Sequence, residues 1–119
     1  MPKISYNYFH QNIEGKLQVL CSIRDMGFCI IKDAPTKEGQ VLEVIKELGF
    51  TRETNYGKLF EVRTEVNPNN LAYTNMGLGS HTDNPYRDPV PTVQLLHCIE
   101  SSTEGGDSVL VDGFNAAKI

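Results

Sequence analysis

The segment Gly79-Ser80-His81-Thr82-Asp83-Asn84-Pro85-Tyr86 places an imidazole and a carboxylate two positions apart. On an extended backbone, side chains at positions i and i+2 point to the same side. We therefore expect His81 and Asp83 to face one metal ion together. Two ligands of this kind, completed by a second imidazole from elsewhere, form the triad that suits non-haem Fe(II) and leaves coordination positions open for chemistry. The segment predicts a metal pair at the rim of a strand.

The residues around this pair favour a ligand-binding loop. Gly77 and Gly79 precede it and allow the backbone to approach a ligand closely or to adopt unusual dihedral angles. Pro85, Pro89 and Pro91 follow it and prevent the extended segment from continuing as a paired strand. Binding residues are common on such loops. A His-x-Asp triplet also occurs as a simple hydrogen-bonded surface pair, and that alternative stays open.

Length and composition exclude several classes of protein. The chain has 119 residues, of which 39% are hydrophobic and 22% are charged, so we expect one ordinary soluble domain. The formal net charge is −4 and no basic cluster occurs, so we expect no nucleic-acid partner. No apolar run approaches the ~20 residues that cross a bilayer, so we expect no membrane insertion. Residues 1–6 lack the apolar core of a signal peptide, which predicts a cytoplasmic location.

The first half carries the patterns of a helix, a strand and a second helix. Apolar side chains recur at helical spacing over residues 12–26, and Gly27 predicts the end of that helix. The apolar, β-branched run Phe28-Cys29-Ile30-Ile31 predicts a buried strand. A second helix follows, with Thr36 as its expected N-cap and Gly49 at its end.

The second half, residues 51–119, carries the patterns of strands. Apolar and charged side chains alternate over 60–66, as in a half-exposed strand. The run 92–99 predicts a central strand, and 107–111 predicts a further strand after a double-glycine turn. Residues 114–118 predict the start of a helix. These patterns indicate a β-rich part that follows the helices.

Together the patterns predict an α+β fold in a single domain, residues 1–119. The helix-strand-helix part spans 12–50 and the β-rich part spans 51–119. An antiparallel, barrel-like sheet would place the metal pair at its mouth, where ligand sites commonly lie.

Five runs of the second half carry a resemblance to a known family: Tyr73-Thr74, His81-Thr82-Asp83-Asn84-Pro85-Tyr86-Arg87-Asp88-Pro89, Gln94-Leu95-Leu96-His97-Cys98, Gly105-Gly106-Asp107-Ser108 and Val111-Asp112-Gly113-Phe114-Asn115. They resemble the γ-butyrobetaine and trimethyllysine dioxygenase branch of the taurine-dioxygenase-like Fe(II)/2-oxoglutarate oxygenases. The resemblance covers roughly residues 15–119. It implies a partial double-stranded β-helix (jelly roll) behind two N-terminal helices, with Fe(II) and 2-oxoglutarate as cofactors. It also implies hydroxylation of a small quaternary ammonium substrate, as in carnitine biosynthesis.

The resemblance also implies roles for residues of the metal and cosubstrate site. His81 and Asp83 match the two iron ligands that lie close together in the sequence. Ser108 falls where a hydroxyl residue contacts 2-oxoglutarate, Asn70 falls where an asparagine lies at the active site, and Leu96 falls where a side chain lines the cosubstrate pocket. These roles are expectations carried over position by position.

Three aromatic residues match the family positions that surround the substrate's trimethylammonium group, namely Tyr56, Phe60 and Tyr73. A quaternary ammonium has no hydrogen to donate, so aromatic faces bind it through their quadrupole, at ~0.5–2 kcal/mol per ring. Phe60 stands where the animal enzyme has a tryptophan, which should weaken the attraction. The alternative, three aromatic side chains in a core, stays open from the sequence alone.

The chain departs from the family in one respect that bears on activity. The family's third ligand is a histidine far downstream, followed by a basic residue that pairs with 2-oxoglutarate, and the sequence ends before either. Of the remaining histidines, we expect His10 to be exposed and His97 to be a satisfied core residue. We therefore expect a truncated catalytic domain that is inactive or nearly so in isolation, and that self-associates as a homo-oligomer through exposed sheet edges. The alternatives are a non-catalytic remnant and a small β-barrel binding module.

Overall fold

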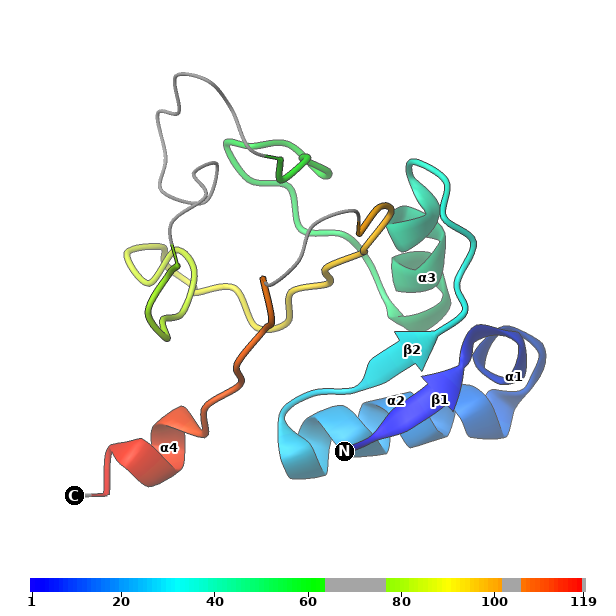
Figure 1. The fold of residues 1–119 in the computed structure, drawn as a ribbon, viewed down its shortest axis with the longest axis horizontal. Coiled ribbons are helices and arrows are strands. Elements are labelled where there is room, and N and C mark those ends of the chain that lie inside the picture. Colours follow the sequence, from blue (N-terminus) through cyan, green and yellow to red (C-terminus); the bar gives the residue numbers. More distant parts are fainter. Residues whose placement is uncertain (64–76, 102–105, 119) are drawn as a thin grey trace. The chain divides into compact units, whose positions relative to one another are not determined.

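The computed structural model describes residues 1–63, 77–101 and 106–118. The chain divides into two units, each described here by itself. The first comprises Met1–Lys58 and Leu95–Ser101, and the second comprises Leu59–Gln94 and Ser102–Ile119. Figure 1 shows the elements in chain order: β1 (Lys3–Ser5), α1 (Tyr6–Gln11), α2 (Ile13–Met26), β2 (Ile30–Lys32), α3 (Gln40–Leu48) and α4 (Gly113–Ala116). No helix in the described ranges has the length and apolar character needed to cross a membrane.

The first unit holds a parallel pair of short strands, β1 and β2. Ile4 of β1 lies opposite Ile31 of β2 in the ladder. The β2 strand confirms a strand at the apolar run that ends at Ile31, although its residues are half-buried or exposed rather than buried. The β1 strand was not predicted, because three residues with one apolar side chain carry no readable alternation. Its backbone groups are satisfied only by pairing with a segment far along the chain.

Helix α1 follows β1 directly, and a single residue separates α1 from α2. The Oγ atom of Ser5 accepts a hydrogen bond from the Tyr8 amide at 3.3 Å and caps α1. Asn12 separates the helices with an extended backbone, and its side-chain amide donates to the Tyr8 carbonyl at 3.2 Å. Gly27 ends α2 in the left-handed region, and its amide donates to the Ile23 carbonyl. The predicted extent and end of α2 are confirmed.

The face of α2 that packs inward differs from the one that its apolar pattern predicted. Gly15 and Val19 are buried, and Ile23 packs against the core one turn further on. A Cβ atom at Gly15 would lie 2.5 Å from the Tyr8 carbonyl oxygen and 2.8 Å from the Phe9 Cα atom, so only glycine allows the α1 backbone this close. The other apolar side chains at helical spacing are largely exposed: Ile13, Leu17, Leu20 and Met26.

The core of the first unit draws one buried side chain from each of four elements: Ile4, Phe9, Val19 and Val44. Helix α3 contributes Val44 and begins later than predicted. Gly39 adopts a left-handed backbone with φ 78°, which a helix interior does not contain, so α3 starts at Gln40. Thr36 as the N-cap is therefore wrong, whereas Gly49 follows the helix as expected.

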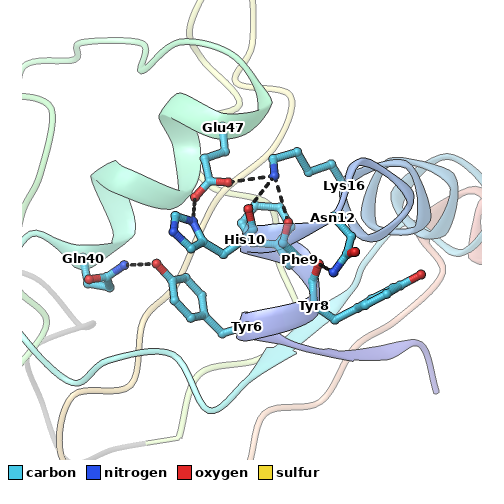
Figure 2. A network of polar contacts seen from close by, with 8 residues as sticks. All are labelled: Tyr6, Tyr8, Phe9, His10, Asn12, Lys16, Gln40 and Glu47. Carbon is cyan, nitrogen blue, oxygen red and sulfur yellow. Dashed lines mark hydrogen bonds and ion pairs between the residues drawn. The ribbon is translucent and has the colours of Figure 1, made fainter.

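A polar network joins α1, α2 and α3 beside this core (Figure 2). Glu47 of α3 lies between His10 of α1, at 2.6 Å, and Lys16 of α2, at 3.0 Å. Gln40 donates to the Tyr6 hydroxyl at 2.9 Å, and the rings of Tyr6 and His10 stack with centroids 5.5 Å apart. The network fixes how α3 sits against the helical pair.

The second unit contains α4 but none of the predicted strands in its described parts. Residues 60–63 and 107–111 have no strand structure, and neither does 92–99, which is shared between the two units. The part of the first strand at 64–66 lies outside the described residues. A strand exists only when a partner accepts its backbone hydrogen bonds, and these segments have no ladder partner among the described residues. Helix α4 confirms the predicted helix start near residue 114, with Asp112 as its N-cap.

The α+β composition is thus confirmed, with two parallel strands and four helices in the described ranges. The jelly-roll sheet does not form among the described residues.

Candidate functional site

The two side chains singled out first by the sequence face each other. The Nε2 atom of His81 lies 3.2 Å from the Oδ1 atom of Asp83. The two residues lie on an irregular segment of the second unit rather than on a strand. Both side chains are about half exposed, at 51% and 46%. The co-direction expected from i, i+2 spacing is therefore present in the structure.

The other nitrogen of His81 is also engaged. Nδ1 lies 2.7 Å from the Gly79 carbonyl oxygen, which can only accept, so Nδ1 carries a proton. In a neutral imidazole, Nε2 then holds a lone pair that points at a carboxylate oxygen of Asp83. Two acceptors at this distance repel unless the ring is protonated or a cation lies between them. A metal-binding histidine is oriented by a hydrogen bond of this kind to a carbonyl.

The carboxylate oxygen of Asp83 that is farther from His81 also has a hydrogen-bond partner. The side-chain amide of Gln94 donates to Oδ2 of Asp83 at 2.9 Å, which leaves Oδ1 as the oxygen nearer His81. The sequence analysis did not identify Gln94 as a site residue. It occurs within the Gln94-Leu95-Leu96-His97-Cys98 run, which belongs to a predicted strand and to the family resemblance, but no role was assigned to Gln94 itself. Its proximity to Asp83 could not be inferred, because eleven positions separate the two residues.

These residues fit a divalent transition metal as two of its ligands. Two donor atoms about 2.1 Å from one ion and at right angles to each other lie about 3.0 Å apart. The 3.2 Å between Nε2 and Oδ1 is close to this separation. One imidazole and one carboxylate also form the nitrogen-oxygen donor set of Fe(II) sites. The same distance suits an ion pair between an imidazolium and a carboxylate.

The residues directly after Asp83 form a short loop with contacts between its own side chains. Asn84 adopts a left-handed backbone with φ 51°, which asparagine tolerates better than most residues. Its side-chain oxygen accepts a hydrogen bond from the Tyr86 hydroxyl at 2.8 Å. The Arg87 guanidinium lies over the Tyr86 ring, with its carbon 5.7 Å from the ring centroid. These contacts shape the segment directly after Asp83.

No third ligand joins the pair in the part of the chain that the structure describes. Groups of three or more His, Cys, Asp or Glu side chains able to hold a metal are absent from the described ranges. His10 is exposed, as expected, and lies 2.6 Å from Glu47 in the first unit. His97 also belongs to the first unit and is only half-buried. Its Nε2 atom is buried without a hydrogen-bond partner among the described residues, so the expectation of a satisfied core histidine is wrong.

The other predicted site residues are distributed over both units of the chain, so each is described by itself. Leu96 is 76% exposed, and Ser108 is also exposed. Asn70 and Tyr73 lie outside the described residues. Tyr56 and Phe60 are partly exposed, at 41% and 46%, and belong to different units. The roles expected for these residues stay predictions.

Comparisons with known proteins show what the chain is similar to. A model of the family described as "Taurine catabolism dioxygenase TauD, TfdA family" matches residues 3–119. Over 118 residues the chain is 36% identical to the γ-butyrobetaine dioxygenases of Pseudomonas sp. (strain AK-1) and Homo sapiens, covering 99% of this chain and 31% and 30% of those proteins. It is 28% identical to the mitochondrial trimethyllysine dioxygenase of Mus musculus, covering 99% of this chain and 28% of that protein. The chain thus spans about 30% of the length of the curated relatives it matches.

Proposed function

Because this chain belongs to the TauD, TfdA family of dioxygenases, we propose that it supplies part of the active site of an Fe(II)- and 2-oxoglutarate-dependent dioxygenase. His81 and Asp83 are the iron ligands in this proposal. The observation that carries it is the 3.2 Å approach of Nε2 to Oδ1, with the far atom of each side chain already hydrogen-bonded. Such outer contacts are typical of metal ligands and are not needed for a surface ion pair.

The chain's own residues would orient the metal. His81 presents Nε2 because Gly79 accepts the proton of Nδ1, and Asp83 presents Oδ1 because Gln94 holds Oδ2. Bound Fe(II), with 2-oxoglutarate and O2, supplies the oxidising power needed to hydroxylate an unactivated carbon. The protein's part is to bind and orient the reactants and to exclude side reactions.

We carry the proposed cosubstrate contacts over from the family, position by position. Ser108 would donate its hydroxyl hydrogen to a carboxylate oxygen of 2-oxoglutarate, which carries two negative charges at neutral pH. Leu96 would give an apolar wall, and Asn70 would supply an amide at the site. The exposure of Leu96 and Ser108 in the structure leaves both side chains accessible to a ligand.

The substrate in this proposal carries a trimethylammonium group. The relatives are named γ-butyrobetaine dioxygenase and trimethyllysine dioxygenase, after compounds that carry this group. Tyr56, Phe60 and Tyr73 are the proposed aromatic contacts, because a cation without hydrogens is bound through ring faces. The proposal covers the class of trimethylammonium compounds, since all share the same cationic head.

A second candidate is a metal-binding protein without turnover. It is favoured by the presence of only two ligands among the described residues, His81 and Asp83. Fewer protein ligands bind Fe(II) more weakly and hold the cosubstrate less firmly. In this form the chain would bind a divalent metal but would not convert 2-oxoglutarate.

Titration with Co(II), a spectroscopic substitute for Fe(II), tests the proposed site. We expect a visible absorption band in the native chain that is lost in His81→Ala and in Asp83→Ala. The matched control is His10→Gln, which removes a histidine of the first unit and should leave the band unchanged. A band that survives in His81→Ala would contradict the proposed ligands.

The activity is tested separately, by succinate formation from 2-oxoglutarate with Fe(II) and O2. Succinate that depends on His81 supports the dioxygenase. Co(II) binding that depends on His81, without succinate formation, supports the second candidate.

A further inference from the structure

We propose that Gln94 is a positioning residue for the metal ligand Asp83. It would hold the carboxylate so that one oxygen, Oδ1, is directed to the ion together with Nε2 of His81. This inference rests on the proposed function, because it presumes that His81 and Asp83 bind the metal. It goes further by assigning a role to a residue outside the ligand pair.

The contact itself has a defined polarity. The Nε2 atom of Gln94 lies 2.9 Å from Oδ2 of Asp83, and both residues belong to the second unit. A carboxylate only accepts, so the amide NH2 group must be the end that faces it, because the amide oxygen would be repelled. The hydrogen bond therefore ties up one oxygen of Asp83 and leaves the other unshared by Gln94.

Such a bond decides how an aspartate can bind a metal. The carboxylate torsion of aspartate is broad and roughly two-fold, so an unrestrained Asp83 would exchange its two oxygens or offer both. A donor on Oδ2 selects the arrangement in which Oδ1 lies 3.2 Å from Nε2 of His81. Less rotational freedom is then lost when the ion binds, which favours binding.

The histidine side of the pair shows the same arrangement. The Gly79 carbonyl accepts from Nδ1 of His81 at 2.7 Å and so fixes which nitrogen is free. In each proposed ligand, the atom that does not face the ion thus has a hydrogen-bond partner, which is Gly79 for His81 and Gln94 for Asp83. Only the Gln94 contact comes from a side chain, so it is the one that substitution can remove.

The role of Gln94 can be separated from a contribution to folding. Gln94 and Asp83 are both exposed, and their hydrogen bond lies outside the core cluster of the first unit. Its loss should leave thermal unfolding almost unchanged. A metal-specific effect of substitution would therefore mark positioning rather than general stability.

The experiment compares Co(II) titrations of the native chain, Gln94→Met, Gln18→Met and His81→Ala by visible absorption. Methionine resembles glutamine in length but has no donor, and Gln18 is an exposed glutamine of α2 that serves as the matched control. We expect Gln94→Met to weaken Co(II) binding by about 10-fold or more and to shift the absorption band, as loss of an outer contact does. Gln18→Met should match the native chain, and circular dichroism should show the same thermal midpoint for both variants.

Each result has a defined meaning. If His81→Ala abolishes binding while Gln94→Met keeps the native affinity and band, the role of Gln94 is overturned and the proposed metal site stands. Equal weakening in Gln94→Met and Gln18→Met also overturns it. If the native chain shows no binding that depends on His81, the proposed site is wrong and the role of Gln94 is refuted with it.

Discussion

The Nδ1 atom of His10 lies 2.6 Å from the Oε1 atom of Glu47, and this contact joins α1 to α3 across 37 positions of the chain. A carboxylate accepts only, so Nδ1 is the donor. Lys16 of α2 approaches the other oxygen of Glu47 at 3.0 Å. One carboxylate therefore connects three helices, as Figure 2 shows.

Because of this contact, we expect the free energy of unfolding to fall at acid pH. Partial burial of Glu47 disfavours its charge, but the hydrogen bonds and charges of His10 and Lys16 outweigh that effect, so the pKa of Glu47 lies below its usual value. A lowered folded-state pKa stabilises the fold at pH values above the unfolded pKa of about 4.3, and this stabilisation is lost as the pH falls through the folded pKa. We expect Glu47→Gln to lower the free energy of unfolding by about 1 kcal/mol at neutral pH. It should also make the decline below about pH 4.5 shallower.

Urea unfolding followed by circular dichroism between neutral pH and pH 3 measures both effects. Glu43→Gln is the matched control, because the pKa of Glu43 is also lowered but its ion-pair partner, Lys46, lies in the same helix. Parallel stability-pH curves for the native chain and Glu47→Gln would contradict the prediction.

Substitution of Phe9 should be the most damaging of the aromatic changes. Phe9 is fully buried at the centre of the first unit, whereas Phe50 is 89% exposed. Removing a buried phenylalanine side chain typically costs about 3–5 kcal/mol. We expect Phe9→Ala to leave the unit largely unfolded at 25 °C and Phe50→Ala to change the free energy of unfolding by less than about 0.5 kcal/mol. Amide hydrogen exchange or circular dichroism distinguishes the two, and similar effects for both variants would refute the core assignment.

Gly15 should not tolerate even a methyl group. The added Cβ would lie 2.5 Å from a backbone oxygen of Tyr8, so α1 and α2 would have to separate. Overpacking of this kind typically costs about 1–3 kcal/mol, which exceeds the ~1 kcal/mol that alanine gains over glycine in a helix. We expect Gly15→Ala to lower the thermal midpoint. Gly113→Ala, at a helical glycine with open space around it, should leave the midpoint unchanged or higher, and the reverse ranking would count against the close approach of the two helices.

The proposed cation site predicts a gain of affinity from one substitution. Tryptophan is the aromatic side chain that attracts a quaternary ammonium most strongly, and the whole attraction of one ring at an exposed position is ~0.5–1 kcal/mol. Phe60→Trp should therefore bind tetramethylammonium more tightly by up to about fivefold, and Phe60→Ala should bind it less tightly. Phe50→Trp is the control, since Phe50 is exposed and has no predicted role. Titration followed by NMR provides the measurement, and equal gains for both tryptophan variants would argue against a specific role of Phe60.

Much of the local structure could be predicted from short-range patterns. Helix α2 and its end at Gly27 follow from apolar spacing and from the freedom of glycine to adopt a positive φ. The later start of α3 was missed, because Thr36 was chosen as a side-chain cap, whereas Gly39 adopts a left-handed backbone and the helix begins after it. The predicted strands over 60–66, 92–99 and 107–111 depended on pairing that no local pattern can guarantee.

The sequence by itself indicated the family and the pair His81 and Asp83, because covalent geometry keeps residues two positions apart within reach of each other. Tertiary structure alone decided which oxygen of Asp83 is held by Gln94, which helices Glu47 joins, and why position 15 must be glycine. The difference is physical. Spacing along the backbone is fixed by covalent geometry, whereas contacts between distant residues exist only when packing brings them within reach.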